Sequence, residues 1–441
     1  MTRQLSLIVL LSVLIASFFV LSFSKMPSVE QDVHNAQAMV LAIRQKGYRS
    51  ELLTKNAKIV FYGNLGEIRA GDIISYSGRI SDVATSVEKK RALSYSRYMM
   101  SKGVAYFVKA KKVELMEKNY NFYTLRQDLI SYMERKISAM YGKDAPLVQA
   151  LVYGERSEIS QEIFEQFAKS GTSHVLALSG FHVGIIAVGV NMLFAKTGIK
   201  NRGLLASALL IFYAFLTGLR PSIIRAVLFF IIFYISFLKN ERYNLFASAC
   251  MCASVLLAWN PYYLYDAGFV LSFAGVFSIA LFYPMLIGLL SSTRWAHNKV
   301  AQAALVTISA QILTAPLGLF YFGRMSLVAV PANLLIVVLI SFIMGLSMIS
   351  LFVHFCATLL PIFYTVDAGL IASVRLLIHA LGELNDFFAQ IPYAFVDEVF
   401  IDAKQLCIIY VMIFSIHLIW ERHKIKENRY EPQRASKVII E

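Results

Sequence analysis

Apolar runs free of charged residues recur along most of this 441-residue chain and constrain its fold more than any other feature. An α-helix rises about 1.5 Å per residue, so about 20 apolar residues cross the roughly 30 Å hydrocarbon layer of a bilayer. The composition, 57% hydrophobic and 16% charged, is that of a membrane protein. We therefore expect a polytopic α-helical membrane protein of about ten helices, at residues 5–23, 174–195, 203–218, 223–238, 244–259, 268–290, 300–321, 327–353, 362–381 and 405–420.

The first of these runs is either a secretory signal or an uncleaved anchor. It is longer than the usual apolar core of a signal peptide, and no convincing small-x-small cleavage site follows it. Residues 1–24 are therefore predicted to form an N-terminal membrane anchor helix.

Basic residues predict how the helices are oriented, because short loops rich in Lys and Arg face the cytoplasm. With the N-terminus inside, every basic loop falls on the cytoplasmic side and the acidic connection at 383–402 falls outside. Both chain ends are then cytoplasmic, and residues 421–441 form a cytoplasmic basic tail. The basic residues concerned are Lys196, Lys200, Arg202, Lys239, Arg242, Arg294, Lys299, Arg422, Lys424, Lys426 and Arg429.

The segment between the first two apolar runs alternates apolar and polar residues, as half-buried strands do. Four or five short strands in about 80 residues, with Gly and Asn at the turns, predict a small extracytoplasmic β-barrel, OB-like, at residues 25–118. Residues 25–145 contain 21 Lys and Arg against 12 Asp and Glu, which is +9 of the chain's net charge of +14. This surplus favours a polyanionic partner.

Basic and aromatic residues are interleaved in the same segment. Proteins bind single-stranded nucleic acid with this combination, because cations neutralise phosphates and aromatic faces stack on bases. The alternative is that the aromatic side chains fill the barrel and the lysines form a solvated face. The predicted DNA-binding residues are Tyr62, Arg69, Tyr76, Arg79, Tyr106, Phe107, Lys109, Lys111 and Lys112.

Residues 119–172 join this segment to the next long apolar run. Leu125, Leu129, Met133 and Ile137 recur every four residues with charges between them, which indicates an amphipathic helix. We expect linker helices at the membrane interface that bridge barrel and bundle. Packing on the protein surface would give the same pattern.

The stretch SHVLALSGFHVGIIAVG, residues 173–189, is apolar enough for a membrane helix but carries polar side chains that a simple span does not need. His174, Ser179 and His182 either pack helices together or face a polar space inside the membrane. We expect one continuous helix that forms a wall of a hydrated passage.

A second stretch, LTGLRPSIIRAVLFF at residues 216–230, places charges near a proline. Arg220 and Arg225 flank Pro221, which suits the first turn of a helix, and Ser222 could cap nearby. A charge at the bilayer centre costs about 2.5–3.5 kcal/mol. Arg225 is therefore expected either to face a cavity or to extend to the outer interface.

A third stretch, NPYYLYDAGFVLSFAGVFSIALFYP, covers residues 260–284. Asn260 and Pro261 are expected to end one helix, and Asp266 to open the next at its favourable N-terminus. Ser272 then faces inward or toward a neighbouring helix.

A fourth stretch contains two prolines, Pro316 and Pro331, which are expected to interrupt their helices. In lipid, an interrupted helix is tolerated only where protein or a water-filled cavity satisfies the freed backbone groups. Asn333, two residues after the second proline, is therefore a candidate cavity-lining residue.

Further along, Asp367 and Arg375 lie eight residues apart on one expected helix and share a face. They either line the passage or form an internal ion pair.

Taken together, these stretches resemble the ComEC-type competence family, the inner-membrane channels for DNA uptake during natural transformation. No single stretch is decisive, but five in the family's order are specific, and an outer barrel after a first anchor helix is also similar to the family's plan. The matching stretches are ALVYGERSEIS (150–160), GTSHVLALSGFHVG (171–184), TGLRPSIIRA (217–226), NPYYLYDAGFVLSFAGVFSI (260–279) and PLGLFYFGRMSLVAVPANLLIV (316–337).

The resemblance implies a polytopic competence (channel) domain at residues 173–420 in the bacterial cytoplasmic (inner) membrane, which passes one DNA strand into the cytoplasm. It implies an extracytoplasmic DNA receptor, a separate nuclease and cytoplasmic helicase or strand-binding proteins as partners, and it leaves a homo-oligomer open. The motif residues carried over are His174, Ser179, Gly180, His182, Pro221, Ser222, Arg225, Ala226, Asn260, Pro261, Asp266, Gly268, Ser272, Phe273, Pro316 and Asn333.

One departure concerns nuclease activity. Many family members continue into a metallo-β-lactamase-like domain with an HxHxDH metal motif, but none of the eight histidines here lies in such a motif. Catalysis, a metal and a cofactor are therefore not expected. No GxxxxGK[ST] loop occurs either, so energy must come from a cytoplasmic partner or from capture of the strand.

Two other functions stay open at this point. A small-solute permease with an accessory domain fits the composition, although no internal repeat is visible. An intramembrane serine hydrolase could use Ser179 and His182, because a serine activated by a histidine is a nucleophile pattern. Its weakness is that side chains three residues apart on one helix rarely aim at each other.

Overall fold

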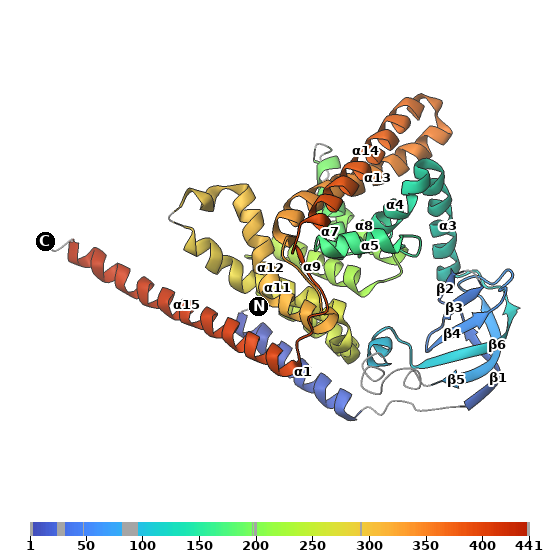
Figure 1. Cartoon of the computed structure of the whole chain (residues 1–441), viewed down its shortest axis with the longest axis horizontal. Coiled ribbons are helices and arrows are strands. Elements are labelled where there is room, and N and C mark those ends of the chain that lie inside the picture. Colours follow the sequence, from blue (N-terminus) through green and yellow to red (C-terminus); the bar gives the residue numbers. More distant parts are fainter. Residues whose placement is uncertain are drawn as a thin grey trace.

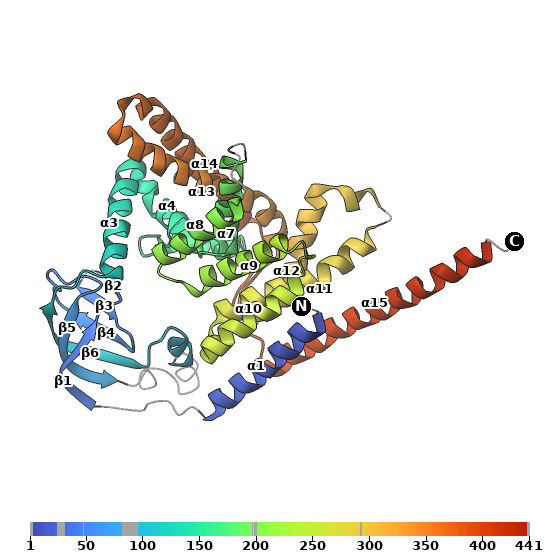
Figure 2. The same cartoon turned by 180° about the vertical axis from the view of Figure 1, so that it is seen from behind.

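A six-stranded sheet lies beside a bundle of helices, and linker helices join the two (Figure 1). The same arrangement is seen from behind in Figure 2. This computed structural model describes residues 3–23, 31–46, 48–81, 96–195, 197, 201–291 and 293–438. Lys196, Lys200 and residues 25–30, which entered the expectations above, lie outside the described residues.

The sheet has the strand order β1-β5-β6-β4-β3-β2. β4 and β6 run parallel, whereas the other neighbouring pairs are antiparallel. β1 and β2 form the two edges, so the expected closed barrel is not found, although only Val40 and Leu41 separate these two strands in the chain. The strands are β1 (Gln31–Met39), β2 (Ala42–Lys46), β3 (Arg49–Leu53), β4 (Ala57–Tyr62), β5 (Ile73–Ser81) and β6 (Tyr106–Glu117).

A row of apolar side chains sets the register of the sheet. Leu52 lies opposite Ile59, Ile59 opposite Val108, and Val108 opposite Ile80. The first three of these side chains are at most 1% exposed. Because side chains alternate between faces, a slip of one residue would turn this whole row to the other side. Burial of the row therefore selects the observed pairing.

Each of the ten expected apolar runs contains a helix. The helices are α1 (Arg3–Phe23), α3 (Phe122–Tyr141), α4 (Ala145–Val152), α5 (Gln161–Lys169), α6 (Ser173–Leu176), α7 (Gly180–Leu193), α8 (Arg202–Leu216), α9 (Pro221–Leu238), α10 (Leu245–Trp259), α11 (Ala267–Leu289), α12 (Lys299–Phe322), α13 (Ala329–Leu359), α14 (Tyr364–Gln390) and α15 (Ala403–Val438). Short 3-10 helices lie at Gly142–Asp144, Pro261–Tyr265, Arg294–His297 and Pro361–Phe363, and β7 (Met325–Ser326) pairs with β8 (Phe395–Val396).

Seven helices of the described chain, α1, α9 and α11 to α15, are long and apolar enough to cross a membrane. The other three expected spans, α7, α8 and α10, have 14 or 15 residues, fewer than the roughly 20 that a full crossing takes. Length alone therefore supports seven of the ten expected crossings.

The prolines do not interrupt their helices as expected. α12 continues through Pro316, and α13 contains Pro331 in its first turn. In the first turn a proline removes an N–H that has no partner within the helix. In a helix interior packed against neighbours, the freed backbone group can be satisfied locally. The expectation from proline alone was therefore wrong at both positions.

The linker helices do not all lie on the surface. α4 is packed inside the bundle, with Val148, Ala150 and Leu151 at most 1% exposed. It belongs to the same apolar cluster as Ile336 and Ile340 of α13. α3 runs from the sheet toward the α13–α14 pair (Figure 1). The linker is therefore a structural part of the bundle.

We expect Gly78→Ala to destabilise the sheet domain. A Cβ at this position would meet the backbone of Lys109 and lie 2.7 Å from the Cα of Ala110, so β5 and β6 would have to separate at their bulge. Limited proteolysis of the purified full chain should cut between residues 31 and 117 faster than in the wild type. Gly184→Ala, where a Cβ meets open space, is the control, and equal cleavage in the two variants would contradict the prediction.

Candidate functional site

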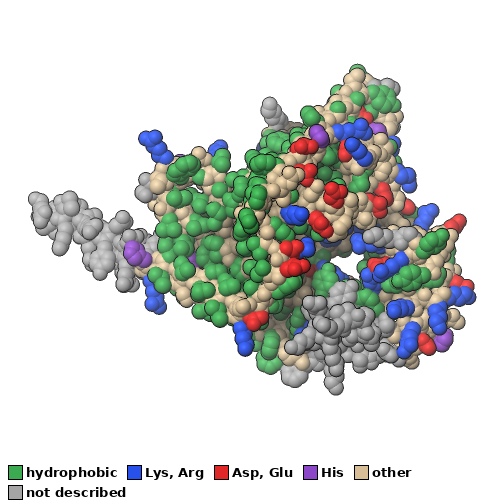
Figure 3. Space-filling model, viewed as in Figure 1, with side chains coloured by type: hydrophobic (Ala, Val, Ile, Leu, Met, Phe, Trp, Pro, Cys, Tyr) green, Lys and Arg blue, Asp and Glu red, His purple; other side chains and the backbone are tan. Residues whose placement is uncertain are grey.

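A cavity of about 2370 Å³ lies between the sheet and the helices. The face shown in Figure 3 is hollowed at this place, with acidic and basic side chains around the hollow. Its wall is built from β2, β3, α3, the loop at 154–158, α6, the turn between α8 and α9, and α11 to α13. Segments that are far apart in the sequence therefore share one space, whose wall carries polar and charged side chains among apolar ones.

The expected continuous helix at 174–195 is broken at this wall. α6 ends at Leu176 and α7 begins at Gly180, so the intervening residues form a short extended segment. The backbone N–H of Ser179 donates to Nδ1 of His182 at 3.2 Å, which satisfies one backbone group freed by the break. His174, Ser179 and Gly180 line the cavity, whereas His182 is fully buried and is not part of its wall.

The Ser179–His182 pair is not arranged as a nucleophile and its base. Ser179 Oγ lies 3.4 Å from Nδ1 of His182, but that nitrogen already accepts the backbone N–H and so has no free lone pair for the serine proton. Nε2 of His182 has no partner among the described residues, so no carboxylate orients the ring. The pair closes a helix end, and within the described residues it lacks the free base nitrogen and the orienting carboxylate that a serine hydrolase uses.

The turn between α8 and α9 is strained. Gly218 has φ +79° and Leu219 has φ +51°, a conformation that costs free energy for a residue with a Cβ. Pro221 is the first residue of α9, as expected, but no side chain caps the helix, so Ser222 does not have the expected role. The turn directs Arg220, Pro221 and Ser222 to the cavity wall.

Arg225 lies in the second turn of α9 and is only 5% exposed. Its Nη2 donates to the backbone carbonyl of Gly268 at 3.2 Å, and its guanidinium carbon lies 5.7 Å from the ring centre of Phe269. Nε has no partner in the described part of the chain. Arg225 therefore faces the cavity rather than the outer interface, and its charge is held by α11.

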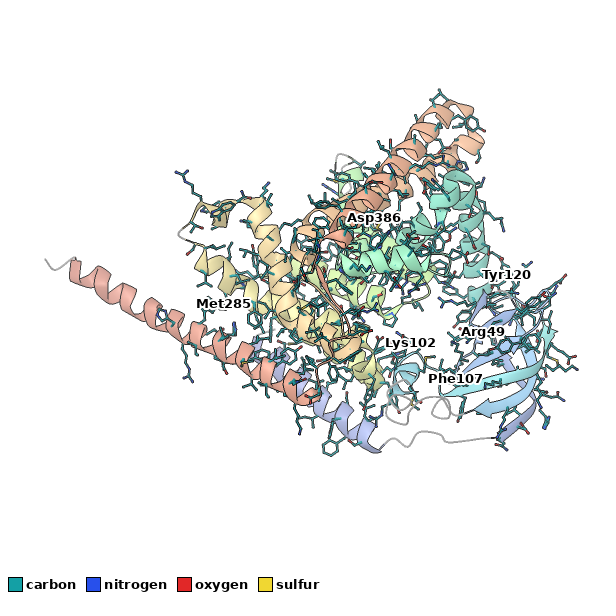
Figure 4. The ribbon with its side chains drawn as sticks, in the orientation of Figure 1. Arg49, Lys102, Phe107, Tyr120, Met285 and Asp386 are labelled. Atoms are coloured by element: carbon teal, nitrogen blue, oxygen red, sulfur yellow. The ribbon has the colours of Figure 1, made fainter. Side chains whose placement is uncertain are left out.

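Asp266 joins the sheet domain to the bundle. As expected, it caps α11, with Oδ1 accepting from the N–H of Gly268 at 2.9 Å. Oδ2 accepts from Nζ of Lys102 at 2.7 Å. Lys102 follows a helical turn between β5 and β6 and lies between the sheet domain and the bundle (Figure 4). Asn260 ends α10, also as expected, and its side chain donates to the carbonyl of Ser101 at 3.2 Å.

Two more expected residues, Ser272 of α11 and Asn333 of α13, line the same cavity. Oδ1 of Asn333 is buried without a hydrogen-bond partner among the described residues. A buried amide oxygen of this kind costs free energy unless water or a ligand reaches it. Pro316 is not part of the wall, although its neighbours Ala315 and Gly318 are.

Asp367 and Arg375 lie elsewhere and do not form the ion pair considered above. Asp367 bonds to Nδ1 of His354 at 2.8 Å, and Nη2 of Arg375 donates to the carbonyl of Met140 at 2.5 Å. His354, Met140 and Arg375 line a smaller cavity of about 610 Å³ between α3, α13 and α14. These two motif residues therefore belong to a separate part of the bundle.

The predicted DNA-binding residues of the sheet do not line the large cavity. Tyr76 and Tyr106 pack against the apolar core of the sheet, as the alternative supposed. Tyr62 is 67% exposed, and Lys112 pairs with Glu114 at 2.7 Å on the surface. Arg79 lies on β5, and Phe107, Lys109 and Lys111 lie on β6. Arg69 precedes β5, and its Nη1 lies 3.8 Å from Oδ1 of Asp128 of α3.

Most basic residues of the cavity wall were not selected from the sequence. They lie in segments that become neighbours only in the fold, although Arg220 was noted beside Pro221 and Arg156 lies in the stretch at 150–160 that resembles the family. Among the described residues, no three His, Cys, Asp or Glu side chains gather as they would around a metal ion. The basic residues missed as wall residues are Arg44, Lys58, Lys102, Arg126, Arg156, Arg220 and Arg324.

The fold and the site together define a multi-pass membrane protein with a large cavity, lined by polar and apolar side chains, next to a small sheet domain. The chain belongs to the competence protein family, whose sequence model matches residues 151–423, more than half of its length. The matched region contains both halves of the broken α6–α7 segment and the part of the cavity wall that the helices after α4 contribute, but not the part from β2, β3 and α3.

Curated relatives agree with this membership. Over 68% of its length the chain is 28% identical to ComE operon protein 3 of Bacillus subtilis, of which it spans 39%. It is 28% identical to an uncharacterized protein of Aquifex aeolicus over 38% of each chain. It is 25% identical to the uncharacterized protein YcaI of Escherichia coli over 48% of its own length and 30% of that protein. No solved structure matches the chain.

We expect the Lys102–Asp266 pair to stabilise the folded chain by about 1–3 kcal/mol, because one partner is buried and charged hydrogen bonds are the stronger ones. A double-mutant cycle with Lys102→Ala and Asp266→Ala, measured by thermal unfolding in detergent, gives this coupling. The exposed Lys112–Glu114 pair is the control, with an expected coupling of about 0–1 kcal/mol. Equal couplings in the two cycles would show that the contact does not hold the domains together.

Proposed function

We propose that this protein is a membrane channel for DNA uptake during natural transformation and that it passes a single strand into the cytoplasm. The observation that carries the proposal is that residues from all five stretches that match the family line one cavity of about 2370 Å³. Membership of the competence family and similarity to ComE operon protein 3 point the same way.

The chemistry of the cavity suits a strand of phosphates. Phosphates cannot enter dry hydrocarbon, so a conducting route must be wet and polar. Ser272 of α11 and Asn333 of α13 supply hydrogen-bonding groups, and Arg225 of α9 supplies a positive charge. A cavity of this size holds far more than the small solute of a permease.

The orientation proposed from the basic loops has both chain ends in the cytoplasm and the sheet outside. The cavity then opens toward the sheet on the outer side of the bacterial inner membrane. We propose the division into an anchor at 1–24, a sheet domain at 25–118, linker helices at 119–172, a channel domain at 173–420 and a basic tail at 421–441.

We further propose that the sheet is an OB-like domain. The strand order and the parallel β4–β6 pair support this, because β1 and β2 then act as two halves of one bent strand that pairs with β5 on one side and β3 on the other. OB-like domains bind single strands on such sheets. The exposed lysines of β6 would collect DNA at the outer surface.

Other proteins are proposed to complete the process: an extracytoplasmic receptor, a nuclease that degrades the second strand, and a cytoplasmic helicase or strand-binding protein that pulls. A second copy of this chain is compatible with the same scheme. The hydrolase alternative is not favoured, because Nδ1 of His182 is occupied by the N–H of Ser179.

We expect Arg225→Ala to reduce entry of labelled DNA into the cytoplasm by about tenfold or more, since a charged group that faces the passage and is held by hydrogen bonding is lost. The measurement compares a deletion strain that carries the wild-type chain with one that carries the variant at equal membrane abundance.

Ser179→Ala is the matched control for this experiment. The variant keeps the backbone N–H that donates to His182, so uptake should stay within about twofold of wild type, as expected for a loss of at most a few tenths of a kcal/mol. Normal uptake in Arg225→Ala, or complete loss in Ser179→Ala, would rule out this channel assignment. Unaltered DNA entry with altered uptake of a small solute would favour the permease.

The basic face of the sheet is expected to make binding of single-stranded DNA depend on salt. Replacing Lys109, Lys111 and Lys112 with Gln in the full chain should reduce the slope of log affinity against log salt by up to about 2, at about 0.7 per phosphate contact. Fluorescence polarisation of a labelled oligothymidylate measures this slope. A slope equal to that of the wild type would remove the sheet from the DNA path.

A further inference from the structure

Four arginines from four different segments converge on one side of the large cavity. Arg44 comes from β2, Arg126 from α3, Arg156 from the loop after α4, and Arg220 from the turn before α9. The carboxylate of Glu155 lies among them on the same wall. We call these five residues the arginine cluster. It carries a net charge of +3 and was not selected as a site from the sequence.

Two of these guanidiniums are positioned by glycines. A Cβ at Gly218 would lie 2.8 Å from Nη2 of Arg126, and a Cβ at Gly154 would lie 2.8 Å from Nη1 of Arg220. Both glycines also have positive φ, +79° and +83°, which side chains with a Cβ adopt at a cost. The backbone therefore leaves room for both guanidiniums where the two loops meet.

Glu155 does not neutralise the cluster. Its Oε1 accepts the backbone N–H groups of Arg156 and Ser157 at 3.1 and 3.0 Å. Burial raises the pKa of Glu155, but the hydrogen bonds from Ser157 and the charges of Arg44 and Arg220 outweigh it, so that its pKa is lowered and the group is ionised at neutral pH. Within the described residues, none of the four arginines has a carboxylate oxygen within 4.0 Å.

One structural role is visible, and it accounts for one arginine only. Nε of Arg126 donates to the carbonyl of Leu216 at 3.0 Å, at the C-terminal end of α8 where a cation is favourable. Within the described residues, the side chains of Arg44, Arg156 and Arg220 have no such partner, yet the charges of the other three arginines oppose that of the partly buried Arg220. An anion in the cavity would remove that repulsion.

We propose that the arginine cluster binds the phosphodiester backbone of the DNA strand at the entrance to the bundle, with Glu155 as the resident anion that the strand partly displaces. The planar guanidinium matches two phosphate oxygens at once, and charge-assisted bonds of this kind are the strong ones. Binding through phosphates carries no sequence preference, as uptake of arbitrary DNA requires. This inference rests on the proposed function.

The test uses the full chain in phosphatidylcholine nanodiscs and a labelled 20-residue oligothymidylate, with salt varied between 50 and 200 mM. For Arg126→Gln combined with Arg220→Gln, we expect about tenfold weaker binding and a salt slope smaller by about 1.4, at about 0.7 per lost phosphate contact. Glu155→Gln keeps an acceptor for the two backbone N–H groups but removes the competing charge, so it should tighten binding about threefold or more. A purely structural cluster would not show this gain.

The control replaces Arg135 and Arg242 with Gln, since both are exposed and outside the cavity wall; its affinity and slope should equal those of the wild type. If the double variant unfolds, Arg156→Gln serves instead, because that side chain is exposed, and its slope should fall by about 0.7. An unchanged slope in the folded cluster variants, or no gain in Glu155→Gln, would overturn the cluster proposal and leave the channel proposal standing. A wild-type chain that does not bind the oligonucleotide would overturn both.

Discussion

A helix that ends inside an apolar bundle leaves backbone N–H and C=O groups that must find partners within the protein. The connections α6–α7, α8–α9 and α10–α11 all end at the large cavity, and so the cavity wall is where these groups concentrate. His182, Asn260 and Asp266 each accept a backbone N–H at one of these ends. These polar residues of the motif stretches therefore hydrogen-bond to the backbone at helix ends. Because several helix ends lie at the same cavity, their polar groups gather along its wall.

The same constraint couples the sheet domain to the bundle. Asp266 closes α11 with one carboxylate oxygen and holds Lys102 with the other. Arg225 of α9 reaches the carbonyl of Gly268 in the first turn of that helix. The N-terminal end of α11 thus contacts both the segment between β5 and β6 and the helix α9. Displacing any one of them would leave a buried charge without its partner, which is costly.

Positive charge gathers at two places, the lysines of β6 and the arginines of the cavity wall. The lysines of β6 are exposed, so salt screens them and they suit a first, weak encounter with a polyanion. Arg126, Arg220 and Arg225 of the cavity wall are partly or fully buried between loops and helices, where the lower dielectric strengthens each contact, whereas Arg44 and Arg156 are exposed. In the proposed route, a strand that moves from the sheet to the bundle passes from more screened to less screened charges, which favours its retention at the bundle.

The sequence by itself determined the membrane class, the alternating strands, the position of Pro221 as a helix start and the capping role of Asp266, because each of these depends on neighbours a few residues away. It did not determine the break at Ser179 or the continuity of α12 through Pro316, because these depend on whether other helices satisfy the freed backbone groups. Nor did it show that Arg44, Arg126 and Arg220 meet at one wall, or that Asp367 pairs with His354 instead of Arg375. Those contacts join residues that are distant in the chain, and only the packing of sheet and helices around the cavity decides which charges share a low-dielectric space.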